Sequence, residues 1–343
     1  MNDFFFSILK GINDFVGNWG VAIILFTILI RLLLTPFDMK SRVSMRRMSK
    51  LQPQLQALQK KYANDREKLN AKTAELYKKE HINPLASCLP MLLTWPILII
   101  IFGAMRSASN RELLGQVTQM LENPGQRPDF EQFLWIKNLW QPDNLFRCAY
   151  VDGDTLKTVS TDLWVEWFEN LQNSGNIPAA LQELGLTTAD FKDSLSATVD
   201  KIMSVINVGG SDYAQAFEST GFEMIIFGRV PKLFNGLMLL PALSAGSQIL
   251  MTKITSMGQP KQEPAPGQPN TGKFMQIFFP LLSVYFCLTY TAAFALYWVV
   301  GNLASMAQTV IINKVLDNRE KKAAGLDRKK GTPDPRHSFL IKR

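Results

Sequence analysis

Hydrophobic residues gather along this chain in long blocks. Five apolar blocks each approach the ~20 residues that a helix needs to cross a bilayer, and none of them contains an Asp or a Glu. The blocks are residues 16–37, 85–105, 233–251, 274–291 and 293–312. The pattern predicts an all-α polytopic membrane protein with five transmembrane helices.

The polar segment 38–83, between the first two apolar blocks, has a helical periodicity of its own. Leucines and a tyrosine follow the spacing of one helix face, at Leu51, Leu55, Leu58 and Tyr62. Asn64 followed by Glu67 is a capping-type helix start. A second face continues with Leu69, Thr73 and Leu76. We therefore expect a helical hairpin that turns near residues 63–65, with a break or kink at Pro53. The spacing leaves two interpretations open, a solvated connector and a functional arm.

Three further polar segments lie between or after the apolar blocks. Residues 106–230 are too many for a simple loop. They include "TDLWVEWFENLQ" and "TTADFKDSLSATVDKIMSVI", which have the pattern of amphipathic helices. We therefore expect a small, mostly helical insertion there. Residues 255–273 are rich in Pro, Gly and Gln, which is typical of a flexible loop. The tail 314–343 is basic and poor in apolar residues, so we expect it to be disordered when free.

Charge is spread unevenly, and its distribution predicts the orientation. The net charge is +8. Segment 38–83 holds 12 Lys and Arg against 5 Asp and Glu, and the tail 314–343 holds 10 against 4. Segment 106–229 holds 9 against 17. Because Lys and Arg mark the cytoplasmic side of a membrane protein, we expect the hairpin and the C-terminus inside and the N-terminus outside.

The sequence offers little catalytic chemistry. His81 and His337 are the only histidines, and both fall in segments expected to be cytoplasmic, which argues against a histidine metal site or triad within the membrane. The sequence has no nucleophile-elbow, zinc-protease or phosphate-loop motif. The apolar blocks also lack the carboxylates on which proton-coupled transporters usually depend. We expect neither an enzyme nor a bound cofactor or metal.

Arg31 stands out because it interrupts the first apolar block. One interpretation is that it snorkels to the cytoplasmic headgroups, and the other is that it faces a water-filled cavity. Thr27 lies one helical turn earlier on the same face. Later blocks carry further polar residues, namely Ser244, Ser247, Gln248, Asn302 and Gln308. A buried charge without a partner costs several kcal/mol, and no block offers Arg31 a carboxylate. We therefore favour a wet groove whose ligand brings negative charge.

Two stretches of the chain resemble the YidC/Oxa family of membrane protein insertases. The first is "RLLLTPFDMKSRVSMRRMSKLQPQLQALQKKYANDREKLNAKTAELYKKEHINPLASCLPMLLTWPILIIIF". It has an intramembrane Arg, a Pro five residues later, a basic hairpin and "NPLASCLPMLL" at the next span. The second is "FFPLLSVYFCLTYTAAFALYWVVGNLASMAQTVIIN". The likeness is to the short bacterial form, without a large external domain before the first span. This chain departs from the family pattern by an expanded external segment at about 145–229.

The resemblance implies a fold and a site. The fold is a five-helix core around a hydrophilic groove that is open to the cytoplasm and to lipid. The groove arginine of the family falls on Arg31, and its neighbouring threonine on Thr27. The polar residue of the third span falls on Gln248, and the aromatic residue of the last span falls on Trp298. These four residues are the expected substrate-binding positions.

The resemblance also implies a function. It is insertion and folding of nascent membrane proteins in the bacterial plasma membrane, alone or with a Sec translocon. The other expected partners are the ribosome, through the basic tail and hairpin, and anionic lipid, and no DNA is expected. A small-solute channel or transporter that uses the same groove is the alternative, and a structural assembly factor is a third possibility. A channel would not need the basic cytoplasmic face that ribosome docking requires.

These expectations divide the chain into consecutive segments. They are the external N-terminus and first span (1–37), the cytoplasmic hairpin (38–83), the second span (84–105), the external insertion (106–230), the third span (231–254), a cytoplasmic loop (255–273), the fourth and fifth spans (274–313) and a basic cytoplasmic tail (314–343).

Overall fold

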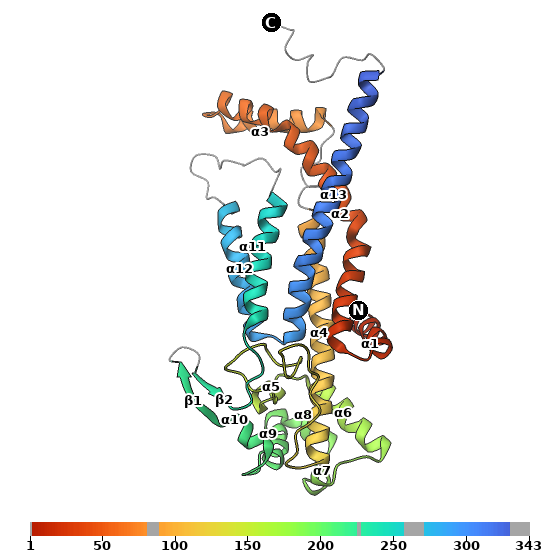
Figure 1. Ribbon diagram of the computed structural model, residues 1–343, viewed down its shortest axis with the longest axis vertical. Helices are drawn as coiled ribbons and strands as arrows, with labels where there is room; N and C mark the ends of the chain where they lie inside the picture. The colour runs from red at the N-terminus through yellow and green to blue at the C-terminus, as the bar shows by residue number, and fades with distance from the viewer. Residues whose placement is uncertain (1, 81–88, 225–227, 257–270, 330–343) are drawn as a thin grey trace. The chain divides into compact units, whose positions relative to one another are not determined.

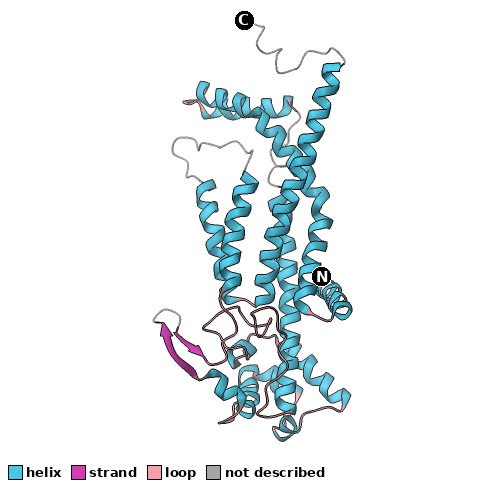
Figure 2. Cartoon of the chain, in the orientation of Figure 1, coloured by secondary structure: helices cyan, strands magenta, loops and turns pink. Residues whose placement is uncertain are grey.

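The computed structural model describes residues 2–80, 89–224, 228–256 and 271–329, and most of its regular structure is helical (Figures 1 and 2). The prediction of a mainly helical protein is therefore confirmed. The described chain forms two compact units. Unit 1 comprises Met1–Ile28, Pro96–Gln248 and Lys273–Val300, and unit 2 comprises Leu29–Trp95, Ile249–Gly272 and Gly301–Arg343.

The long helices correspond in position to the apolar blocks. They are α2 (Trp19–Lys61), α4 (Leu89–Glu122), α11 (Leu239–Ser256), α12 (Thr271–Thr289) and α13 (Ala292–Lys329). In the described part of the chain, Trp19–Lys61 and Ala292–Lys322 are long and apolar enough to cross a membrane, and Gln276–Thr289 is a shorter apolar helix. The total of five spans, with its segment boundaries, stays a prediction.

Unit 1 combines a helical bundle with the insertion. Aromatic rings connect α4 with the end of α12 and the start of α13. The Phe102 ring lies 4.8 Å from that of Tyr290 and 5.4 Å from that of Phe294, edge to face. Such edge-to-face pairs add stability beyond the area that they bury. A separate helix, α1 (Asn2–Val16), precedes α2 in this unit.

The insertion is built from short helices, as expected. They are α5 (Gly153–Lys157), α6 (Thr161–Ser174), α7 (Ala179–Glu183), α8 (Thr188–Asp193), α9 (Leu195–Ile206) and α10 (Asp212–Phe217). The buried ring of Trp164 from α6 stacks on Phe191 from α8 at 5.7 Å. The second amphipathic stretch forms two helices rather than one. Ser194, with φ −153° and ψ 80°, interrupts it, and the Ser194 carbonyl accepts from the Thr198 N–H at 3.0 Å.

The third predicted span begins as a helix later than its apolar block, at Leu239. The buried carboxylate of Asp143 is the reason, since it caps this helix. It accepts from the backbone N–H of Met238 at 3.1 Å and from that of Leu240 at 2.7 Å. It also accepts from Trp135 Nε1 at 3.1 Å. A carboxylate at a helix N-terminus satisfies otherwise unpaired donors.

A second joint holds the insertion to the start of α2. The Glu131 carboxylate accepts from the Trp19 backbone N–H at 3.1 Å. The Trp19 ring packs edge to face on Trp140 at 5.2 Å. Gly20 lies directly beneath the Phe133 ring, so that a Cβ at this position would collide with it. Burial raises the pKa of the Glu131 carboxyl, and the hydrogen bond from Trp19 partly offsets that effect.

A small antiparallel sheet is the exception to the all-α prediction. β1 (Ser219–Met224) pairs with β2 (Gly228–Pro231), with Glu223 opposite Arg229 and Met224 opposite Gly228 (Figure 2). The pattern "GFEM" is too short to predict a strand. Its pairing into a sheet depends on β2, which follows later in the chain.

Unit 2 contains the predicted hairpin. α2 continues to Lys61, and α3 (Arg66–Lys79) follows after a turn at residues 62–65, as expected. The helix cap is Asp65 rather than Asn64, because the Asp65 carboxylate accepts from the Lys68 N–H at 3.0 Å. The chain does not break at Pro53, since α2 continues through both Pro36 and Pro53, and a kink there stays a prediction. Leu51 and Leu55, on either side of Pro53, are both buried, and such burial stabilises this part of α2.

The prediction of a disordered tail is wrong for residues 314–329, which extend α13 as a helix to Lys329. Acidic side chains of this extension pair with cations of α2. Asp317 pairs with Arg46 Nη1 at 2.6 Å, and Glu320 pairs with Lys50 Nζ at 3.2 Å. A basic tail with acids at one helical spacing can therefore dock on α2. Residues 330–343 lie outside the described part of the chain.

Candidate functional site

Polar side chains of α2 and α13 in unit 2 contact one another along the two helices, and we call this set the α2–α13 ladder. Its members are Thr35, Asp38, Arg42, Arg46 and Lys50 on α2 and Gln308, Thr309, Asn313, Asp317 and Glu320 on α13. Arg42 Nη2 donates to Thr309 Oγ1 at 2.5 Å. Arg46 Nη2 donates to the Asn313 carbonyl at 3.1 Å. The ladder replaces apolar helix packing by hydrogen bonds at the predicted cytoplasmic end of the first span.

Arg31 stands at the start of the α2 stripe that forms the ladder. Its side chain is half-buried, and Thr35 Oγ1 donates to its carbonyl at 3.0 Å. The Asp38 carboxylate interacts electrostatically with both Arg31 and Arg42. The apolar blocks themselves offer Arg31 no carboxylate, but the polar segment that follows the first block does. Asp38 is one residue beyond the predicted first span, and two helical turns bring it to the face of Arg31.

Gln308 is the polar centre of the ladder. Its Nε2 donates to Thr35 Oγ1 at 3.1 Å, and its side chain also hydrogen-bonds Asp38. Among the described residues, its buried Oε1 has no hydrogen-bond partner. A buried acceptor of this kind calls for a donor from water or from a ligand.

The other three predicted site residues belong to unit 1. Thr27 is fully buried, and its Oγ1 donates to the Ile23 carbonyl at 2.6 Å, so its hydroxyl is satisfied within α2. Gln248 is half-buried on α11. Trp298 packs on Phe294 at 5.8 Å, and its buried Nε1 has no partner within the described chain. Arg31 belongs to unit 2, and the grouping of all four residues into one groove stays a prediction.

The family that is described as the 60Kd inner membrane protein matches residues 11–320. The chain belongs to the YidC/Oxa family. The chain is 38% identical over 153 residues to a membrane protein insertase YidC of Fusobacterium nucleatum subsp. nucleatum, with 45% of the chain and 66% of that protein covered. It is 39% identical over 145 residues to the YidC of Clostridium tetani, with 41% and 58% covered.

A third relative, the membrane protein insertase YidC of Francisella tularensis subsp. novicida, is 46% identical over 101 residues. That match covers 29% of the chain and 18% of the relative. The chain thus spans less than two thirds of these relatives. Membership in the YidC/Oxa family confirms the resemblance, and it agrees with a membrane protein that is not an enzyme.

Sequence reasoning missed Asp38, Arg42 and the partners of Arg46. The signal was available, because Arg31, Thr35, Asp38 and Arg42 follow the 4-3-4 spacing of one helix face. The polar face is predicted only within the first apolar block, which ends at residue 37, whereas α2 continues as one helix to Lys61. Their α13 partners could not be found in this way, because Arg42 and Thr309 are 267 residues apart.

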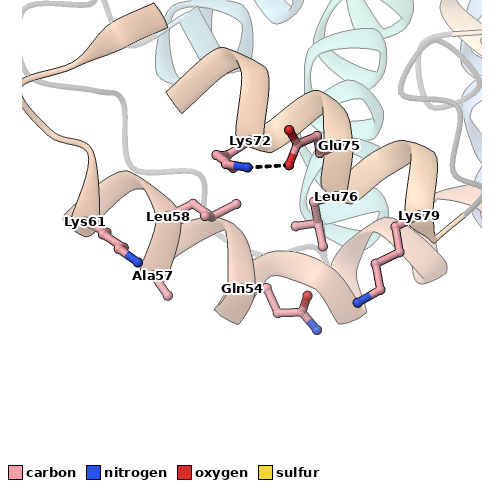
Figure 3. Close-up of a pocket in the computed structure, with 8 residues that line it drawn as sticks. All are labelled: Gln54, Ala57, Leu58, Lys61, Lys72, Glu75, Leu76 and Lys79. Carbon is pink, nitrogen blue, oxygen red and sulfur yellow. Dashed lines mark hydrogen bonds and ion pairs between the residues drawn. The ribbon is translucent and has the colours of Figure 1, made fainter. Parts of the chain in front are cut away.

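The hairpin offers a second candidate surface, which we call the hairpin hollow (Figure 3). It has a volume of about 400 Å³. Its lining residues are Gln54, Ala57, Leu58 and Lys61 of α2 and Lys72, Glu75, Leu76 and Lys79 of α3. Lys72 pairs with Glu75 at 2.7 Å, so the remaining lysines leave the rim positive around an apolar floor of Leu58 and Leu76. Such a hollow suits a segment that combines apolar and acidic residues.

Proposed function

We propose that this protein is a membrane protein insertase that inserts nascent membrane proteins through a polar intramembrane groove and helps them to fold, alone or with a Sec translocon. The stripe Arg31–Thr35–Asp38–Arg42 carries this proposal. It runs from within the predicted first span to its cytoplasmic end, next to the open acceptor of Gln308. Ionisable groups at such a depth usually face water or a polar passage.

Desolvation is the energetic obstacle that this stripe would lower. A hydrophilic stretch that enters hydrocarbon without partners costs several kcal/mol for each polar group. Water, the Arg31 guanidinium and the Gln308 oxygen would replace the lost hydration. The apolar segment of the client then partitions into lipid, with a gain of about 25 cal/mol for each Å² removed from water. No cofactor and no covalent step are required.

The proposed orientation places the hairpin and the tail in the cytoplasm and the insertion outside. The positive rim and apolar floor of the hairpin hollow support a role in client capture. The basic residues of the tail support contact with ribosomal RNA or with anionic lipid, since both present phosphates.

Reconstitution of the pure full-length chain in liposomes tests the proposal, with a single-span client whose translocated tail is acidic and with protease protection as the readout. We expect insertion by the wild type and a clear loss in Arg31→Ala and Arg31→Glu. Arg31→Lys should retain much of the activity, since a point charge is sufficient for electrostatic attraction. Lys40→Ala is the matched control, because Lys40 is an exposed cation of the same helix.

Two outcomes would contradict the proposal. If Arg31→Glu inserted the acidic client as well as the wild type, the electrostatic account would fail. If the liposomes passed small solutes but inserted no client, the channel or transporter alternative would replace the insertase.

A further inference from the structure

The β1–β2 hairpin of the insertion is unusual because its first strand has no covering layer. Every residue of β1 is exposed, and Phe222 and Met224 are 55% and 40% exposed. A two-stranded hairpin by itself is marginally stable in water. The exposed apolar side chains of β1 therefore call for a surface that would cover them.

The hairpin separates apolar from charged residues by face. Successive side chains of a strand alternate, so Phe222 and Met224 share one face and Glu223 takes the other. Glu223 lies directly opposite Arg229, and their charged groups pair at 3.6 Å. At the base, Glu218 and Lys232 pair at 2.6 Å. The charges of the hairpin thus cancel in pairs, which lowers the cost of an approach to hydrocarbon.

The position of the hairpin identifies the surface. The hairpin, the end of α12 and the start of α13 all belong to unit 1. In Figure 1, β1 rises from the insertion toward the level at which α12 ends and α13 begins. With α12 and α13 as membrane spans, as predicted, this level would be the edge of the bilayer, and the apolar face of β1 would lie near it.

We propose that the β1–β2 hairpin is an interfacial membrane anchor, whose Phe222 and Met224 enter the headgroup region of the leaflet on the insertion side. Aromatic and long apolar side chains on one face of an element are suited to this region. The occupant of the exposed face is lipid rather than another protein. The anchor would hold the insertion against the membrane at a second place, away from its joints to α2 and α11.

Spin labels on the full-length chain in nanodiscs test this anchor. In a background with Cys88, Cys148 and Cys287 replaced by Ala, single cysteines are introduced by Phe222→Cys, Glu223→Cys and Met224→Cys. The readout is the collision rate of each label with oxygen, which concentrates in lipid, relative to that with a water-soluble nickel chelate. Asn173→Cys is the control, since Asn173 is exposed on α6.

We expect labels at 222 and 224 to favour oxygen, the label at 223 to favour it less, and the label at 173 to favour nickel. The alternation keeps the test informative even if one substitution disturbs the hairpin. Nickel preference at both 222 and 224, equal to that at 173, would overturn the anchor. Shielding of both labels from both reagents would also overturn it, because it would show that protein and not lipid covers this face.

Discussion

At the scale of single residues, charged side chains are used in two ways. Asp143 is fully buried and fully satisfied, since it accepts from Trp135, Met238 and Leu240. The ladder residues Asp38 and Arg42 are only partly buried, and they interact with more than one partner each. The first arrangement holds a helix start in place, while the second, under the proposed function, would exchange partners with water or with a client.

Substitution of Asp143 should therefore act on stability. Asp143→Ala leaves two backbone donors and an indole N–H without their acceptor, and we expect a loss of roughly 3 kcal/mol or more. The measurement is the thermal unfolding midpoint of the purified protein in detergent. Asp154→Ala is the control, because the Asp154 side chain is 97% exposed. Equal midpoints for the two variants would show that the cap is not needed.

At the scale of elements, α2 and α13 are longer than the apolar blocks that predict them. Both helices continue beyond the hydrocarbon length and meet through the ladder. Exposed ion pairs such as Lys50–Glu320 contribute little, about 0–1 kcal/mol. The helical extension of the tail is therefore held weakly on α2. Its basic side chains remain available for an anionic partner.

The hairpin hollow should act in client capture. Leu58→Glu and Leu76→Glu each place a negative charge in the apolar floor of the hollow, which would repel an acidic client. We therefore expect each variant to show less crosslinking to the client and less insertion of it into liposomes. Gln56→Glu is the matched control, since Gln56 is exposed on α2 and does not line the hollow. Equal activity of all three variants would favour the interpretation of the hairpin as a solvated connector.

The extension of α13 should bind the ribosome through its basic side chains. Replacement of Arg319, Lys321 and Lys322 by Gln should weaken co-sedimentation with ribosomes at low salt. The slope of the salt dependence should decrease by about one for each phosphate that the variant no longer neutralises. Truncation after Asn318 should have at least the same effect. Binding that is unchanged in detergent without anionic lipid would exclude this assignment of the tail.

At the scale of the whole molecule, the basic hairpin and the acidic insertion are expected on opposite sides of the membrane. An impermeant maleimide should label Asn173→Cys in intact cells and Asn70→Cys only after the membrane is opened. Both residues are exposed, and both variants carry Ala at the three native cysteines. Labelling of Asn70→Cys from outside would reverse the proposed orientation.

The sequence by itself determined what depends on neighbours within a few turns. The apolar blocks, the turn of the hairpin, helix α6 and the uneven charge all follow from local composition and period, and the described helices agree with them. The same periodicity, extended by one turn past the apolar block, would have found Asp38.

Only the tertiary structure decided the features that join distant segments. Asp143 sets the start of α11 from 97 residues away, and Thr309 meets Arg42 across 267. The helical course through Pro53, the helical tail and the β1–β2 hairpin are further examples. In each case a distant partner, or packing around the residue, offsets what local propensity would forbid or leave open. A hydrogen bond between distant residues leaves no period in the sequence, because its donor and acceptor are brought together only by the fold.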